Sequence, residues 1–379
     1  MKKSFLLFVI LFPLWGQGGF AQIIRRCNND PTVPLGLNMY RTLQAAHDAA
    51  VANDIIYVEP SYQGTTTYGD FTCTKTLRII GNGYDQAQNP TIVQPWEQKV
   101  SLVGYVTIEA GTGTVLQGLY LQLGVLIKAS NVTITRCSIH GQLTLQRLSA
   151  SQNASGAIIS HNFFENVYYS FTNIYGYSTY NSATCSYTLF PVQNVIFKNN
   201  INLRFSAFGN SASGGSCTPS IPSTSIPSAN NITITNNTFN GGNSITNCQN
   251  CTVHSNIFRE PPVTGILNNC PGTAASYNVC STNPCVNGTN NVDAVTDNIL
   301  FVGGNATTYD KNLQLTGSSQ AVGAGLGGVD AGAFGTNNPY RLSGLAPVPQ
   351  ITAYSQNASS GIYTTATPMS ITISVRGNN

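Results

Sequence analysis

A nine-residue pattern returns five times in the middle of this chain, starting at Asn131, Gly156, Asn194, Asn231 and Asn250. Within each copy, small or apolar residues alternate with polar or β-branched ones, and four copies have Asn at the seventh position. Alternation with period two is typical of a short strand with one buried face, and Asn is typical of the bend that follows it. The pattern therefore predicts repeated strand-and-turn units.

Stacking of the copies explains why one residue type returns to one position. With strands in register about 4.8 Å apart, the second and fourth residues of each copy form two inward columns. The Asn side chains then form a ladder of amides at the turn. Its predicted members are Asn162, Asn200, Asn237 and Asn256, while Cys137 takes this place in the first copy. We expect an all-β parallel β-helix, a single-stranded solenoid.

Near the start of the mature chain, segment 40–50 has the pattern of a short helix. Thr42 suits the N-cap position, and Leu43, Ala46 and Ala50 fall on one face. A helix of this kind would close the open end of the coil core.

The helical segment, followed by strand-like segments 54–60 and 77–83, resembles the opening of uncharacterised exported bacterial right-handed parallel β-helix proteins. That family is related in fold to pectate lyases and polygalacturonases. Segment 313–335 is similar to the family's last coil. The resemblance implies a right-handed solenoid with an N-terminal capping helix, but it implies little about chemistry.

Residues 1–21 have the layout of a secretory signal, with Lys2 and Lys3, an apolar stretch from Phe5 to Trp15, and a small-residue exit ending at Ala21. We therefore expect an exported protein, either extracellular or on the outer cell surface. No later segment offers the roughly 20 apolar residues of a membrane-spanning helix. Without the two signal lysines, 17 basic residues become 15 against 14 acidic ones, which leaves no electrostatic footprint for nucleic acid.

The expected domain is a β-helix over residues 22–338, with inserted loops at about 168–190 and 206–228, where ladder positions lie unusually far apart. Residues 339–379 form a Pro-containing tail with strand-like runs at 351–354 and 371–375. This tail either folds back on the last coil or belongs to a larger domain.

Ten cysteines in an exported chain favour disulfides over metal sites. Cys248 and Cys251 resemble half of a zinc knuckle whose other half would be Cys280 and Cys285, but disulfides or buried thiols are the favoured interpretation. Another candidate disulfide joins the two inserted loops through Cys185 and Cys217.

No cofactor and no catalytic metal are expected. Late in the chain, four acidic residues leave a structural calcium ion open as an alternative, although no regular ligand loop is visible. These residues are Asp293, Asp297, Asp310 and Asp330.

Hydrolysis of a glycosidic bond usually requires a pair of carboxyl groups, and the central coils contain few acidic residues. Between Asn131 and Cys280 the acidic residues are Glu165 and Glu260, which the repeat places roughly 14 Å apart. A metal-free lyase would use polar residues that follow the ladder position in successive coils. The catalytic candidates are His140, Glu165, Arg204 and Arg259. Solvated turn residues are the favoured alternative.

The first inserted loop is rich in aromatic residues among Asn, Ser and Thr, a composition suited to sugar rings or protein partners. Its candidate ligand-binding residues are Tyr168, Tyr169, Tyr175, Tyr177, Tyr180 and Tyr187. Packing of the loop over its own coil is the alternative for most of these rings.

A second apolar row, formed by Phe163, Ile201 and Ile257, is predicted to face outward from the coils. Such a row is either a contact surface or is covered by an inserted loop.

Three functions follow. The first is a non-catalytic secreted or cell-surface protein that binds a polysaccharide or a surface partner. The alternatives are a polysaccharide lyase or glycoside hydrolase acting on an acidic polysaccharide, and a purely structural spacer.

Overall fold

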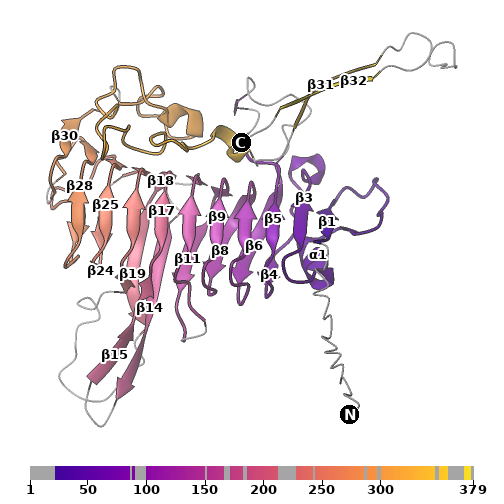
Figure 1. Cartoon of the computed structure of the whole chain (residues 1–379), viewed down its shortest axis with the longest axis horizontal. Coiled ribbons are helices and arrows are strands. Elements are labelled where there is room, and N and C mark those ends of the chain that lie inside the picture. The colour runs from indigo at the N-terminus through magenta and orange to yellow at the C-terminus, as the bar shows by residue number, and fades with distance from the viewer. Residues whose placement is uncertain are drawn as a thin grey trace, which may run out of the picture.

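The computed structural model describes most of the chain after residue 21. The described residues are 22–85, 88–89, 100–149, 152–165, 171–181, 186–211, 228–241, 244–285, 288–296, 300–345, 350–356 and 371–376. They form an elongated stack of short strands, with one α-helix near its N-terminal end (Figure 1). The expectation of an all-β parallel solenoid is confirmed.

Two long sheets build the solenoid, and every pair within the first sheet is parallel. In spatial order the first sheet contains β2 (Met39–Tyr40), β1 (Ile24–Cys27), β3 (Ile55–Val58), β5 (Arg78–Ile80), β7 (Val115–Gln117), β9 (Thr133–Thr135), β12 (Ile158–Ser160), β17 (Ile196–Lys198), β21 (Thr233–Thr235), β25 (Thr252–His254) and β28 (Ala274–Ser276).

The second sheet is also parallel, apart from one hairpin. Its strands are β4 (Phe71–Cys73), β6 (Leu102–Ile108), β8 (Tyr120–Ile127), β10 (Ser138–Ile139), β11 (Gln142–Gln146), β13 (Phe163–Phe164), β14 (Thr172–Asn181), β15 (Ser186–Phe190), β18 (Ile201–Leu203), β19 (Phe205–Ser211), β22 (Thr238–Phe239), β26 (Ile257–Phe258), β29 (Val279–Ser281) and β30 (Val292–Val295). The antiparallel pair is β14 with β15.

Two short parallel sheets complete the coils. One contains β16 (Val192–Gln193), β20 (Ala229–Asn230) and β24 (Cys248–Gln249), and the other contains β23 (Ile245–Thr246) and β27 (Leu267–Asn268). Farther along, β31 (Gln350–Gln356) and β32 (Ile371–Arg376) form an antiparallel pair in the tail.

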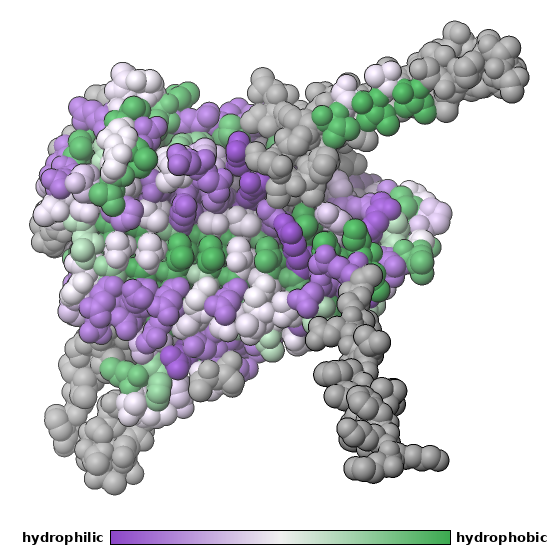
Figure 2. Space-filling model, viewed as in Figure 1, coloured by the Kyte–Doolittle hydropathy of each residue, from purple (hydrophilic) through white to green (hydrophobic). Residues whose placement is uncertain are grey.

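The strands pair in the register that the repeat predicts. Ile134 lies opposite Ile159, which lies opposite Phe197, and all three side chains are fully buried. Because equivalent positions stack, side chains of like polarity form rows along the solenoid axis (Figure 2). The interior is thus a set of apolar columns.

At the turn between the two sheets, buried Asn side chains form a continuous ladder. The backbone amide and the Nδ2 group of Asn162 both donate to Oδ1 of Asn200, at 3.1 and 3.0 Å, and Asn200 repeats this pattern with Asn237. Each Nδ2 group also reaches back to a strand carbonyl, as Asn200 does to Ile159 at 2.8 Å. The ladder continues through Asn256, Asn278 and Asn291.

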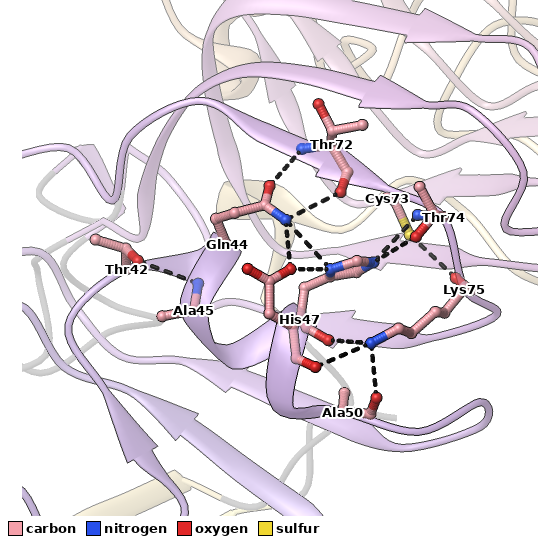
Figure 3. A network of polar contacts seen from close by, with 10 residues as sticks. Thr42, Gln44, Ala45, His47, Ala50, Thr72, Cys73, Thr74 and Lys75 are labelled. Carbon is pink, nitrogen blue, oxygen red and sulfur yellow. Dashed lines mark hydrogen bonds and ion pairs between the residues drawn. The ribbon is translucent and has the colours of Figure 1, made fainter.

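The helix α1 (Leu43–Ala49) begins at Thr42, whose side chain accepts a hydrogen bond from the amide of Ala45, as an N-cap does. Leu43 and Ala46 are fully buried against the first strands. At its other end, Lys75 Nζ donates to three carbonyls of the last turn, including that of His47 at 2.9 Å (Figure 3). This amine satisfies carbonyls that a helix terminus leaves without partners.

The prediction that segment 313–335 forms a last coil is wrong. Residues 300–345, which we call the arm, run back along the outside of the second sheet toward the N-terminal coils (Figure 1). The amide of Gly332 donates to the Ser255 carbonyl, whereas the Asn338 carbonyl contacts His161 and the Leu345 carbonyl accepts from Arg136. Segment 313–335 is rich in Gly and lacks period-two alternation, and it forms turns and bends instead of a stacked strand.

The arm buries the outward apolar row of the second sheet. Phe163, Ile201 and Ile257 are fully buried in a second cluster that also contains Phe301 and Leu313 of the arm. The row is therefore not an exposed contact surface. It is covered by the arm, which follows the last coils, and not by a loop inserted into the central coils.

A buried polar network fixes the far end of the arm. Asp310 accepts hydrogen bonds from the Tyr340 hydroxyl at 3.1 Å and from the Ser343 amide at 2.7 Å, while the Tyr340 hydroxyl also bonds that of Tyr84. Residues 340–345 therefore dock on early coils near β5, not on the last coil.

Candidate functional site

The structure stacks the catalytic candidates in one row beyond the second sheet. The His140 amide donates to the Leu121 carbonyl, that of Glu165 to Ile139, and that of Arg259 to Phe239. These bonds place His140 and Glu165 on neighbouring coils, and Arg259 three coils farther along the same edge.

Arg259 packs against the arm. It is 6% exposed, its guanidinium lies 5.6 Å from the Phe301 ring, and it donates to Asn240 Oδ1 and to the Asn305 carbonyl. Phe301 and Asn305 are arm residues, so this candidate is held beneath the arm, away from solvent.

Arg204 lies at the base of the inserted hairpin. Its guanidinium lies over the Phe171 ring, 5.2 Å from the ring centroid, and burial lowers its pKa. The Arg204 carbonyl accepts from the amide of Thr172, the first residue of β14. These contacts connect Arg204 to the hairpin rather than to His140.

His140 and Glu165 do come together. Nδ1 of His140 lies 3.7 Å from Oε2 of Glu165, and the same oxygen accepts from the Ser138 hydroxyl at 3.2 Å. The Tyr120 ring stacks on that of His140, with centroids 6.3 Å apart. Since the His140 and Glu165 side chains are 38% and 26% exposed, this cluster is open to solvent.

A second carboxyl group, that of Asp85, interacts electrostatically with Glu165, and the sequence did not indicate it. Burial, together with the charges of Glu165 and Asp310, raises the pKa of Asp85 to about 7. Its Oδ2 atom is fully buried and has no hydrogen-bond partner in the described structure. Asp85 belongs to the segment after β5, outside the central coils. We call Asp85, Tyr120, Ser138, His140 and Glu165 the Glu165 site.

Tyr120 is coupled to the same carboxylates. Its pKa is raised by burial, by a hydrogen bond with Glu165 and by the charges of Glu165 and Asp85. A phenol in this setting stays protonated and acts as a hydrogen-bond donor.

The aromatic insert is a hairpin that projects from the body of the solenoid (Figure 1). Tyr175 and Tyr177 lie on one face of β14 and are both partly exposed. The Tyr177 ring stacks on that of Phe190 in β15, with centroids 5.9 Å apart, and the Arg147 guanidinium lies 5.3 Å from the Phe190 centroid. We call these four residues the hairpin platform.

For the other tyrosine candidates, the structure gives at most the position in a strand. Tyr180 and Tyr187 lie opposite each other in the β14–β15 register. Tyr168 and Tyr169 lie outside the described residues, as do Cys185 and Cys217 of the candidate disulfide.

Four of the cysteines form two short-range disulfides, Cys248–Cys251 and Cys280–Cys285. These bonds use the thiols that a zinc site would need. Asp293 lies close to the second pair and accepts from the Cys285 amide at 2.7 Å, an ordinary turn contact.

The other late acidic residues that the structure describes also bond to protein groups. Asp310 accepts from Tyr340, Ser343 and Asn89, and Asp330 accepts from the Gly323 amide. Asp297 lies outside the described residues.

Comparison with known proteins does not identify the chain. No protein-family model matches it, and no curated protein matches it. No helix among the described residues is long and apolar enough to cross a membrane.

Proposed function

We propose that this protein is an exported right-handed parallel β-helix that binds a glycan, with α1 closing the N-terminal end of the coil core. In this proposal the solenoid is a rigid body, and the β14–β15 hairpin carries the binding surface. The two disulfides suit an oxidising compartment outside the cytoplasm.

The hairpin platform is the observation that carries the proposal. Partly exposed aromatic rings beside a guanidinium provide flat apolar faces for sugar rings and donors for sugar hydroxyls. Because β14 pairs with β11 and β19 as well as with β15, the rings are held on an extended sheet. A pre-ordered surface loses less entropy when it binds.

Retention on insoluble glycans tests this function. The mature protein is incubated with chitin, cellulose and peptidoglycan, and the bound fraction is compared with that of the double variant Tyr177→Ala, Phe190→Ala. Tyr57→Ala is the matched control, because Tyr57 is a partly exposed tyrosine on β3, away from the hairpin.

We expect at least one glycan to retain the parent and the control but not the double variant. Equal retention of all three proteins, or failure of every glycan to retain the parent, would refute the proposal.

A further inference from the structure

A free thiol lies beside a disulfide in the last coils of the solenoid. Cys270, which follows β27, is a free cysteine whose side chain is partly exposed. In the preceding coil, Cys248 at the start of β24 is bonded to Cys251. A thiol that can reach a disulfide sulfur can exchange with it, so the relative position of these three cysteines decides what they can do.

The register of the two coils stacks Cys270 on Cys248. The amide of Cys251 donates to Oγ1 of Thr273, 22 positions farther along the chain, at 3.1 Å. Strands β23 and β27 pair with the same offset. Because Cys248 and Cys270 fall between these two contacts and have the same separation, they occupy equivalent positions. Cys251 is stacked by Thr273, so Cys248 is the disulfide sulfur that faces the free thiol.

Spacing and direction both suit a bond between the stacked cysteines. Neighbouring parallel strands lie about 4.8 Å apart, within the roughly 4.4–6.8 Å that separates the Cα atoms of a disulfide. Cys248 continues the buried column of Val192 and Ala229, and Cys270 packs against the same core cluster. Sγ of Cys270 donates to the carbonyl of Ile245, at 3.2 Å, on the segment that leads into Cys248.

We propose that Cys270 exchanges with the Cys248–Cys251 disulfide, so that the last coils exist in two covalent forms. The Cys270 thiolate attacks Sγ of Cys248, and the Cys248–Cys270 bond forms as the Cys248–Cys251 bond breaks. Cys251 leaves as a thiolate and takes up the proton that Cys270 lost. The number of disulfides stays the same, so the step requires no oxidant or reductant. This inference does not depend on glycan binding.

The two forms differ in what the disulfide connects. The Cys248–Cys251 bond closes a loop with a sequence separation of 3 inside one coil, whereas the exchanged bond joins neighbouring coils. Because a disulfide that closes a longer loop restricts the unfolded chain more, the exchanged form should hold the last coils together more firmly. Burial raises the pKa of the Cys270 thiol, and the attacking species is the thiolate, so exchange should be faster at higher pH.

Peptide mapping of the intact protein tests the exchange. Samples are kept at about pH 6 and about pH 9, then denatured in mild acid with N-ethylmaleimide and digested with trypsin. Trypsin cuts after Arg259, so the Cys248–Cys251 bond lies within one peptide and the exchanged bond links two peptides. We expect peptides linked through Cys248 and Cys270, with Cys251 alkylated, to be at least about threefold more abundant at the higher pH.

Two single variants show whether the link depends on this thiol. Cys270→Ser should abolish the linked peptides and leave Cys251 protected from alkylation. Cys137→Ser is the matched control, because Cys137 is another free cysteine of the coil interior and follows β9 in a distant coil. Its linked fraction should equal that of the parent.

A second pair of variants tests the stacking itself. In Cys251→Ser, mild oxidation with glutathione disulfide should join Cys248 to Cys270. In Cys248→Ser, the same treatment should not join Cys251 to Cys270, because Thr273 occupies the stacked position.

Absence of linked peptides from the parent at both pH values would overturn the exchange, even if oxidised Cys251→Ser forms its link. Linked peptides that persist in Cys270→Ser would overturn it as well. Equal yields of the link in oxidised Cys251→Ser and Cys248→Ser would contradict the assignment of Cys248 as the attacked sulfur.

Discussion

Two apolar clusters are buried equally well, one inside the coils and one outside them. Inside, rings from neighbouring coils stack directly, as Phe239 does on Phe258 with centroids 4.4 Å apart. Outside, Phe163 and Ile257 are just as buried, but their cover is the arm.

The two clusters differ in the sequence distance that they span. Ladder contacts join residues 13 to 38 positions apart, such as Asn162 and Asn200 at the upper end. Contacts of the arm join residues 134 positions apart at Asn199 and Ala333, and 256 apart at Tyr84 and Tyr340. Because distant contacts require closure of a long loop, the arm should dock after the coils form and open before they unfold.

Removal of a central ladder amide should have the largest effect. Asn200→Ala leaves the donors of Asn162 and the carbonyl of Ile159 without partners inside the core, which should lower the free energy of unfolding by about 3–6 kcal/mol. Asn231→Gly is the control, because Asn231 bonds Asn194 at the surface and has a positive φ that Gly tolerates. Urea unfolding should show a loss of about 1 kcal/mol or less for the control, and equal losses would contradict the role of the ladder.

A pair of ring truncations compares the clusters directly. Phe239→Ala and Phe163→Ala should each cost about 3–5 kcal/mol, since each removes a buried ring. The interior change should lower the midpoint of coil unfolding. The exterior change should first expose the arm to limited proteolysis, with cuts between residues 300 and 345. Identical cleavage of the two variants would show that the clusters are one cooperative unit.

Tyr340→Phe probes the anchor of the arm more gently. It removes one hydrogen bond to buried Asp310 and one to Tyr84. The free energy that holds the arm against the coils should fall by about 1–3 kcal/mol. Faster amide exchange in 330–345 than in the parent should reveal this cost, while exchange at the ladder should not change. Faster exchange at the ladder as well would argue against a separate arm.

Replacement of Asp85 should have the effect that depends most on conditions, because it acts through pH. Burial and the facing charges of Glu165 and Asp310 raise its pKa from 3.8 to about 7. The folded protein therefore holds the Asp85 proton more tightly than the unfolded chain, and the stability from this group is present below pH 3.8 and is lost as pH rises through about 7. Asp85→Asn should flatten this slope in thermal unfolding between pH 4 and about 8. A parallel pH profile in parent and variant would show that Asp85 carries no such shift.

The repeat contains most of the information about the coils. Period-two alternation places Ile134, Ile159 and Phe197 in one column, and Asn at a fixed position places the ladder. The copies with Asn278 and Asn291 are harder to recognise, because Tyr277 and small residues interrupt the pattern there. Local alternation also indicates strands β3, β5, β31 and β32, and cap chemistry indicates α1.

The arm and the Glu165 site could not be predicted in the same way. The arm has no period, so nothing in 313–335 distinguishes a stacked coil from a segment that folds back. His140 and Glu165 share one coil position and could be paired from the repeat. Asp85 lies outside the repeat, and only the tertiary fold brings its carboxyl to Glu165.

Hydrogen exchange of the intact protein, followed by mass spectrometry across increasing denaturant, tests the separation of the two clusters most directly. We predict that amides of the arm, such as those of Gly332 and Tyr340, exchange through a low-energy opening while amides of the ladder, such as those of Asn200 and Asn237, exchange only with global unfolding. Exchange of both sets through one opening of the same free energy would contradict the account.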